Sequence, residues 1–144
     1  MAHRVENSAL VNYSAQQMFD LVNDIEAYPQ FMDGCVAATI TARGDDWLEA
    51  RLTLNKAGIN QSFITHNQLQ PPHTMTMDLV DGPFKYLRGI WRFSPLGETG
   101  CKVSFELEFE MQNRLLGMAL GKVFETAGSK QVDALCARAR VVYK

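Results

Sequence analysis

The fold is decided by the C-terminal stretch of residues 101–144, which reads CKVSFELEFEMQNRLLGMALGKVFETAGSKQVDALCARARVVYK. Its first ten residues alternate between apolar and polar or charged side chains, which predicts a strand with one buried face. Asn113 is a good helix N-cap, and the apolar residues after it recur at helical spacing up to about Val142. The apolar stripe of this helix comprises Leu116, Leu120, Val123, Phe124, Ala127, Leu135 and Val142.

Three glycines interrupt this helix, at Gly117, Gly121 and Gly128. Each weakens a helix by roughly 1 kcal/mol relative to Ala. Three in one helix predict local bending or close approach to another part of the molecule.

Upstream of residue 101 the pattern predicts a strand over 4–11, then one or two helices, then five more strands. Ser14 and Gln17 form a capping box for the first helix, and a second short helix or turn is expected around Tyr28. Turn-forming residues separate the later strands at 44–46, 55–58, 70–73, 81–83 and 95–97.

Short connections between consecutive strands imply an antiparallel sheet, which can leave one face to water. The other face must be covered, and the long C-terminal helix is the large element available. We therefore expect one α+β domain over residues 1–144, with a curved sheet of about seven strands around that helix. Side chains alone fill such a space poorly, so a ligand cavity between helix and sheet is expected.

The amino-acid composition argues against several classes of protein. The chain has 14 Lys and Arg against 16 Asp and Glu, which argues against nucleic-acid binding by bulk charge. Hydrophobic residues at 47% exclude a disordered chain. The sequence has no apolar run of about 20 residues and starts without a signal-peptide core, so we expect a cytoplasmic protein. The chain contains seven Met and eight Phe, which is a high number for a domain of this size.

The motifs around the first helix and in the later strands resemble those of the coenzyme-Q-binding START-like family, within the polyketide cyclase/dehydrase superfamily. The resemblance rests on Tyr28-Pro29-x-Phe31 before Cys35, and on Asp81-Gly82-Pro83-Phe84-Lys85 before Leu87-x-Gly89-x-Trp91. It spans almost the whole chain and implies a START/Bet v 1-like helix-grip fold. Where the family usually has Pro-Trp before the Cys, at the expected pocket mouth, this chain has Asp33-Gly34, and Asn12 replaces another usual Pro.

The resemblance implies two functions. The first is non-enzymatic binding of a lipophilic isoprenoid quinone, ubiquinone, as a ligand that supports respiratory electron transport, with peripheral contact at the inner membrane. The alternative is that of the family's ribosome-association toxin branch, which binds the large (50S) ribosomal subunit, blocks subunit association and has a small ubiquitin-like antitoxin partner. A cyclase-like enzyme is a third and weaker reading.

Aromatic and Met side chains are the candidate pocket lining, because flat rings stack on a quinone and Met adapts to irregular ligands. An ordinary filled core is the alternative. The candidates are Phe19, Tyr28, Phe31, Phe63, Met75, Met77, Phe84, Trp91, Phe105 and Phe124. Phe84 and Lys85 are either part of a plain turn or a loop at the cavity mouth, where Phe84 would face a lipid tail or a partner and Lys85 an anion.

Polar residues offer three further patterns. One strand carries three polar residues that either face the cavity or lie at the solvent-exposed end of the strand: Gln61, Thr65 and Asn67. Arg88 is expected opposite Glu108 on the outer face of the sheet. Four cations near the end of the chain either complement the helix dipole or contact ribosomal RNA or anionic lipid; they are Lys130, Arg138, Arg140 and Lys144.

No catalytic residue and no metal site are predicted. Cys35, Cys101 and Cys136 lack metal-ligand spacing and are expected to be reduced thiols. His3 is expected at a flexible start, His66 outward and His73 in a loop, and none lies at motif spacing from a nucleophile or a carboxylate.

Overall fold

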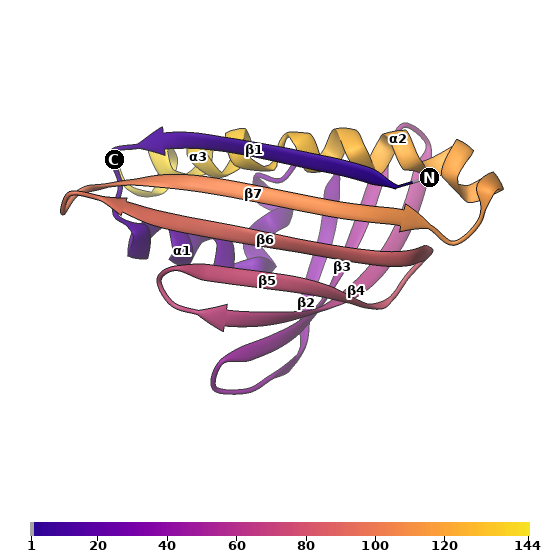
Figure 1. Cartoon of the computed structure of the whole chain (residues 1–144), viewed down its shortest axis with the longest axis horizontal. Helices are drawn as coiled ribbons and strands as arrows, with labels where there is room; N and C mark the ends of the chain where they lie inside the picture. The colour runs from indigo at the N-terminus through magenta and orange to yellow at the C-terminus, as the bar shows by residue number, and fades with distance from the viewer. Residues whose placement is uncertain (1) are drawn as a thin grey trace.

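Seven strands form one antiparallel sheet in the computed structural model, which describes residues 2–144. The spatial order is β1-β7-β6-β5-β4-β3-β2, so every strand after the first lies beside its sequence neighbour and β1 closes against β7. The strands are β1 His3–Val11, β2 Cys35–Arg43, β3 Trp47–Lys56, β4 Ile59–Gln70, β5 Thr74–Asp81, β6 Phe84–Leu96 and β7 Gly100–Met111. The predicted α+β fold with a curved sheet is confirmed, and Figure 1 shows β2, β3 and β4 turning away behind the front strands.

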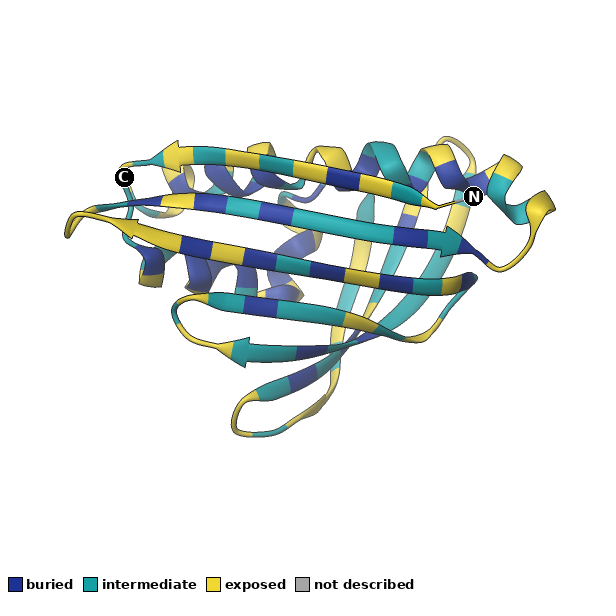
Figure 2. Ribbon diagram, viewed as in Figure 1, coloured by how far each residue is buried: buried dark blue, intermediate teal, exposed yellow. Residues whose placement is uncertain are grey.

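Alternation along the strands separates a buried face from a solvent face, as the bands on β6 and β7 in Figure 2 show. Arg88 lies opposite Glu108 across β6 and β7, as predicted. The two side chains use other partners, however: Tyr86 donates a hydrogen bond to Glu108, and the Arg88 guanidinium lies over the Tyr86 ring. The side chains on the solvent face of β6 and β7 therefore do not all form ion pairs with the residues directly opposite them.

The first helix, α1 Ala15–Asn23, begins as predicted at Ser14. The Gln17 amide N–H donates to the Ser14 hydroxyl at 3.1 Å, and the Gln17 side chain accepts from the Ser14 N–H at 2.9 Å. The expected second short helix is a 3-10 helix, η1 Ile25–Gln30. These two helices close one end of the concave face.

The C-terminal helix is bent into two segments, α2 Arg114–Ser129 and α3 Gln131–Val142, which lie along the sheet in Figure 1. Asn113 caps α2 as predicted, accepting from the Leu116 N–H at 2.9 Å. The bend follows Gly128 and Ser129, a residue pair at which helices commonly kink, and the Lys130 N–H bonds back to Ala127 and Gly128. Gly128 also allows close approach, since a Cβ there would stand 2.9 Å from Leu107.

The buried residues form two clusters. The larger one joins α1 and α3 to the middle of the sheet, and the smaller one joins α2 to the ends of β6 and β7. The eight Phe residues divide equally between the two clusters, and in the smaller one four rings meet with centroid distances of 4.8–6.2 Å. We call Phe63, Phe84, Phe109 and Phe124 the aromatic cluster.

The free edge of the sheet at β2 is irregular. Its pairing with β3 shifts register between Cys35 and Ala37 and again between Ile40 and Ala42. Such shifts mark β-bulges, which bend and twist a strand. Among residues 2–144, no helix is long and apolar enough to cross a membrane.

Candidate functional site

A cavity of about 110 Å³ lies between the inner face of the sheet and the helices. Its walls come from every strand except β1, together with η1, α2 and the start of α3. Three inward residues of β3, Ala50, Leu52 and Leu54, follow its length. The expected cavity between helix and sheet is therefore present.

Six of the ten predicted lining residues surround this cavity. They are Tyr28, Phe63, Met77, Trp91, Phe105 and Phe124. Trp91 and Phe105 form its central aromatic wall, with ring centroids 4.5 Å apart. Their role in ligand binding stays a prediction.

The other four predicted residues lie elsewhere in the structure. Phe19 is buried against the edge of the Phe93 ring, and Met75 is buried beside Asn67. Phe31 packs between the Tyr28 ring and the Arg138 guanidinium. Phe84 belongs to the aromatic cluster. Alternation along a strand identifies buried side chains, but it does not show which of them border an empty space. The prediction that these four residues line the cavity failed for that reason.

The Asp81-Gly82-Pro83 turn lies against the cavity wall. Gly82 adopts a φ of 151°, and a Cβ there would stand 2.7 Å from the Cβ of Phe63, so Gly is required for this close approach. Phe84 turns inward and is 3% exposed, which contradicts the idea that it faces a lipid tail or a partner. Lys85 points out and pairs with Glu110 at 3.4 Å.

Thr65 and Asn67 provide the polar spot inside the cavity. Both line it and both are almost fully buried. Thr65 donates a hydrogen bond to the Asn67 side-chain oxygen at 2.7 Å, and the Asn67 amide faces the Met75 sulfur at 3.7 Å. Sulfur is a weak acceptor, so the Asn67 amide retains donor capacity toward a ligand. Gln61 is only partly buried and does not line the cavity.

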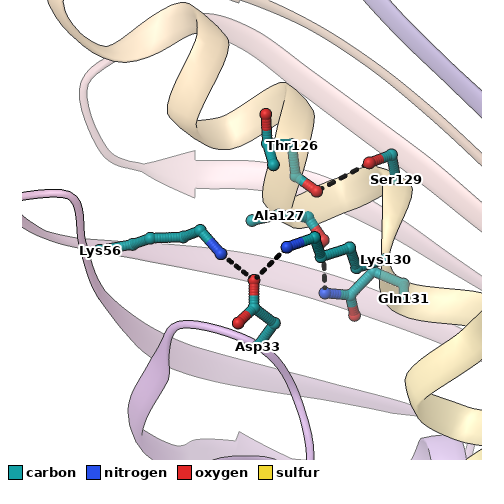
Figure 3. Close-up of polar contacts among 7 residues, drawn as sticks. All are labelled: Asp33, Lys56, Thr126, Ala127, Ser129, Lys130 and Gln131. Carbon is teal, nitrogen blue, oxygen red and sulfur yellow. Dashed lines mark hydrogen bonds and ion pairs between the residues drawn. The ribbon is translucent and has the colours of Figure 1, made fainter.

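Charged side chains gather where the cavity meets solvent. Asp33 and Gln131 are part of its lining, and Asp33 forms ion pairs with Lys56 and with Lys130. The hydrogen bond from Lys56 lowers the pKa of Asp33 below its ordinary value, with the Lys130 charge adding to the effect. We call Asp33, Lys56 and Lys130 the rim cluster; Figure 3 shows both lysines directed at one carboxylate oxygen.

One buried tyrosine and the three cysteines have raised pKa values. Tyr28 donates its hydroxyl to the Val22 carbonyl, and burial raises the pKa of that hydroxyl. Burial likewise raises the pKa of the Cys35, Cys101 and Cys136 thiols, and all three are free. Weakly ionised thiols are poor nucleophiles.

The three histidines lie away from the cavity. His3 is held in β1, stacked on Phe109 and paired with Glu125 at 2.8 Å, so the expected flexible start is wrong at this residue. His66 stacks on Trp47. The expected loop comprises residues 71–73, since Gln70 still belongs to β4, and His73 follows two prolines in it.

The C-terminal cations divide into two groups. Lys130 belongs to the rim cluster, and Arg138 bonds Gln30 at 3.1 Å and covers the Phe31 ring. Arg140 and Lys144 are exposed. The expected basic end is therefore partly used to hold the fold together.

Comparison with known proteins gives consistent matches. Residues 11–136 match the family described as polyketide cyclase / dehydrase and lipid transport. The "Ribosome association toxin RatA" of Vibrio cholerae serotype O1 is 46% identical over 140 residues, which cover 97% of both chains. The protein of the same name in Escherichia coli K12 is 43% identical over 97% of this chain and 89% of its own.

One more distant sequence relative and one solved structure also match this chain. The mitochondrial coenzyme Q-binding protein COQ10 of Drosophila melanogaster is 29% identical over 110 residues, which cover 74% of this chain and 46% of that protein. The crystal structure of the Zhui aromatase/cyclase from a Streptomyces species superposes with a TM-score of 0.87 over 100% of this chain and 97% of the other, at 16% identity. At that identity the likeness concerns the fold alone.

Proposed function

We propose that this chain, which belongs to the polyketide cyclase / dehydrase and lipid transport family, is a ribosome-association toxin that binds the large ribosomal subunit and prevents subunit joining. One observation carries the proposal: relatives named for ribosome association are 43–46% identical over nearly the whole chain. The relative named for coenzyme Q is more distant and matches a shorter part. The proposal includes a cytoplasmic location and a small antitoxin partner, and it requires no catalytic step.

The distribution of charge supports a ribosomal partner. Residues 112–144 hold six Lys and Arg against two Asp and Glu, although the whole chain has fewer basic than acidic residues. Within this segment the exposed cations are Arg114, Lys122, Lys130, Arg140 and Lys144, and Asp133 is the exposed acid. A local basic surface binds phosphate backbones even when the net charge is near zero. We infer that the bent helix is the ribosome-facing side.

Sedimentation tests this proposal. The purified protein is mixed with bacterial ribosomes and run on a sucrose gradient at low salt, where it should migrate with the large subunit. Overexpression should also reduce the fraction of intact ribosomes. If the protein stays at the top of the gradient at low salt, ribosome association is overturned.

Two double charge-reversal variants test whether the bent helix is the surface that contacts the ribosome. Arg114→Glu with Arg140→Glu changes exposed positions on α2 and α3, whereas Arg51→Glu with Lys102→Glu changes exposed positions on the sheet by the same total charge. The helix pair should release the protein at lower salt than the wild type, because fewer phosphate contacts remain, and the sheet pair should not. Equal release by both pairs would contradict the assignment to the helices.

The cavity favours a second candidate function, binding of an isoprenoid quinone. Trp91, Phe105 and Phe63 offer stacking surfaces, and the Asn67 amide can donate to a carbonyl oxygen. A volume of about 110 Å³ is smaller than the ~150 Å³ of an engineered cavity that binds benzene. Because a substituted quinone ring is larger than benzene, the cavity would have to widen to admit the ring, and the tail would have to widen it further or lie outside.

Mass spectrometry of lipid extracted from the purified protein tests this second function. A bound quinone supports it. A protein that carries none and takes up no added ubiquinone would overturn it. Trp91→Ala or Phe63→Ala should weaken uptake more than Arg88→Ala, because Arg88 lies on the outer face of the sheet.

A further inference from the structure

The rim cluster joins three parts of the chain that are far apart in sequence. Asp33 lies in the loop between η1 and β2, Lys56 ends β3, and Lys130 sits at the junction of α2 and α3. The hairpin turn after Lys56, with positive φ at Ala57 and Gly58, positions the end of β3 beside that loop. Both ammonium groups approach Oδ2 of Asp33, Lys130 at 3.5 Å (Figure 3).

The cluster carries one positive charge in excess. Two ammonium groups share a single carboxylate, and within residues 2–144 no second carboxylate pairs with Lys56 or Lys130. The side chains of Asp33 and Lys130 are 39% and 51% exposed, so the pairs are open to exchange with a solute. The mouth of the cavity therefore favours an anion.

The interior behind this mouth is apolar. Leu52, Leu54 and Leu107 form its walls next to the rim, and Thr65 and Asn67 bond each other further along β4. No charged side chain other than Asp33 lines the cavity in the described part of the chain. An apolar body can thus be buried there while a charged end stays at the mouth.

We propose that the cavity binds an apolar carboxylic acid, with its hydrocarbon part against Leu52, Leu54 and Phe63 and its carboxylate between the ammonium groups of Lys56 and Lys130. The ligand carboxylate takes the position now held by Asp33, which acts as an internal substitute in the empty protein. This ligand class differs from a neutral quinone, and its binding does not depend on the ribosome.

The test compares two small probes by isothermal titration calorimetry of the purified chain at pH 7 and low salt. Octanoate and 1-octanol have the same chain length and differ in the charged end. Octanoate should bind about tenfold more tightly, the difference expected of a charge-assisted contact. Equal affinities, or binding of neither probe, would overturn the proposal.

Variants locate the head group. Lys56→Met with Lys130→Met should remove the preference for octanoate and leave octanol binding unchanged. Lys122→Met is the matched control, because Lys122 is an exposed lysine of α2 outside the cavity, and it should keep the preference. A preference that survives the double substitution contradicts the proposal.

Asp33→Asn gives an independent readout in the opposite direction. Without the competing carboxylate, octanoate should bind several times more tightly and octanol as before. Weaker octanoate binding in this variant would contradict the exchange of carboxylates. Urea unfolding midpoints close to that of the wild type confirm that each variant is folded. Ribosome sedimentation is measured separately, so failure of one proposal is not failure of the other.

Discussion

The two halves of the bent helix meet the sheet differently. Along α3, Val132, Leu135 and Ala139 are buried against α1 and the sheet, with 0–2% exposure. Along α2, the buried face borders the cavity, and the first turns expose Leu115 at 76% and Met118 at 81%. The contrast indicates that α3 anchors the helical layer and α2 forms the adaptable wall of the site.

The largest expected difference between the halves is in the cost of a truncated leucine. Leu135→Ala in α3 should lower the free energy of unfolding by about 4 kcal/mol, and Leu120→Ala in α2 by about 2 kcal/mol. Both side chains are buried, but α2 can move toward the cavity and fill the lost volume. Urea unfolding at pH 7 measures both values. Equal losses would mean that α2 is as rigidly packed as α3.

A smaller effect is expected for Phe63→Leu, which opens the cavity on the α2 side. The loss of edge contacts with Phe84 and Phe124 should cost about 1 kcal/mol. The wider cavity should bind 1-octanol more tightly, measured by calorimetry. Phe93→Leu is the control, since Phe93 is buried on the α3 side and does not line the cavity. It should lower stability without changing octanol binding.

Gly117→Ala should stabilise the protein by about 0.5–1 kcal/mol. Ala is the better helix former, and a Cβ at Gly117 meets nothing within 4 Å. Gly128→Ala should show almost no gain, because its Cβ would press on Leu107 at 2.9 Å. Thermal unfolding midpoints compare the two variants. A larger gain at Gly128 would show that Leu107 moves freely into the cavity.

The smallest effect concerns the rim cluster and its pH dependence. The folded-state pKa of Asp33 is lowered, so its pairs contribute stability that is complete above the ordinary value of 3.8 and is lost as the pH falls through the folded pKa. Since the side chain is partly exposed, the contribution is under about 1 kcal/mol. Asp33→Asn should lose it at pH 7. The wild type and the variant should converge in urea unfolding as the pH falls through the lowered pKa of Asp33.

Most of the fold could be predicted from periodicity. The clean alternation of residues 101–110 and the capping signals at Ser14 and Asn113 led to the correct order of elements. The glycines of the last helix predicted local bending or close approach, and both occur at Gly128, where the helix bends and the backbone comes close to Leu107. The position of the bend could not be predicted, because residues on both sides keep a helical pattern.

The site was predicted less completely. Trp91 and Phe105 were correctly placed beside the cavity, since a sheet that grips a helix buries its central aromatic residues. The rim cluster was missed as a unit, because Asp33, Lys56 and Lys130 are distant in sequence and meet only through tertiary packing. The sequence marked this part of the cavity mouth only through Asp33-Gly34, which replaces the Pro-Trp that the family usually has there.

The two register shifts in β2 affect how readily a second chain could pair with this edge strand. A strand at the border of a sheet presents unpaired backbone groups that another chain can extend into a larger sheet. With shifts near Val36 and Thr41, β2 offers no long straight ladder to a second molecule. This edge strand is therefore a poor template for pairing with another chain, although Val36 is 54% exposed on it.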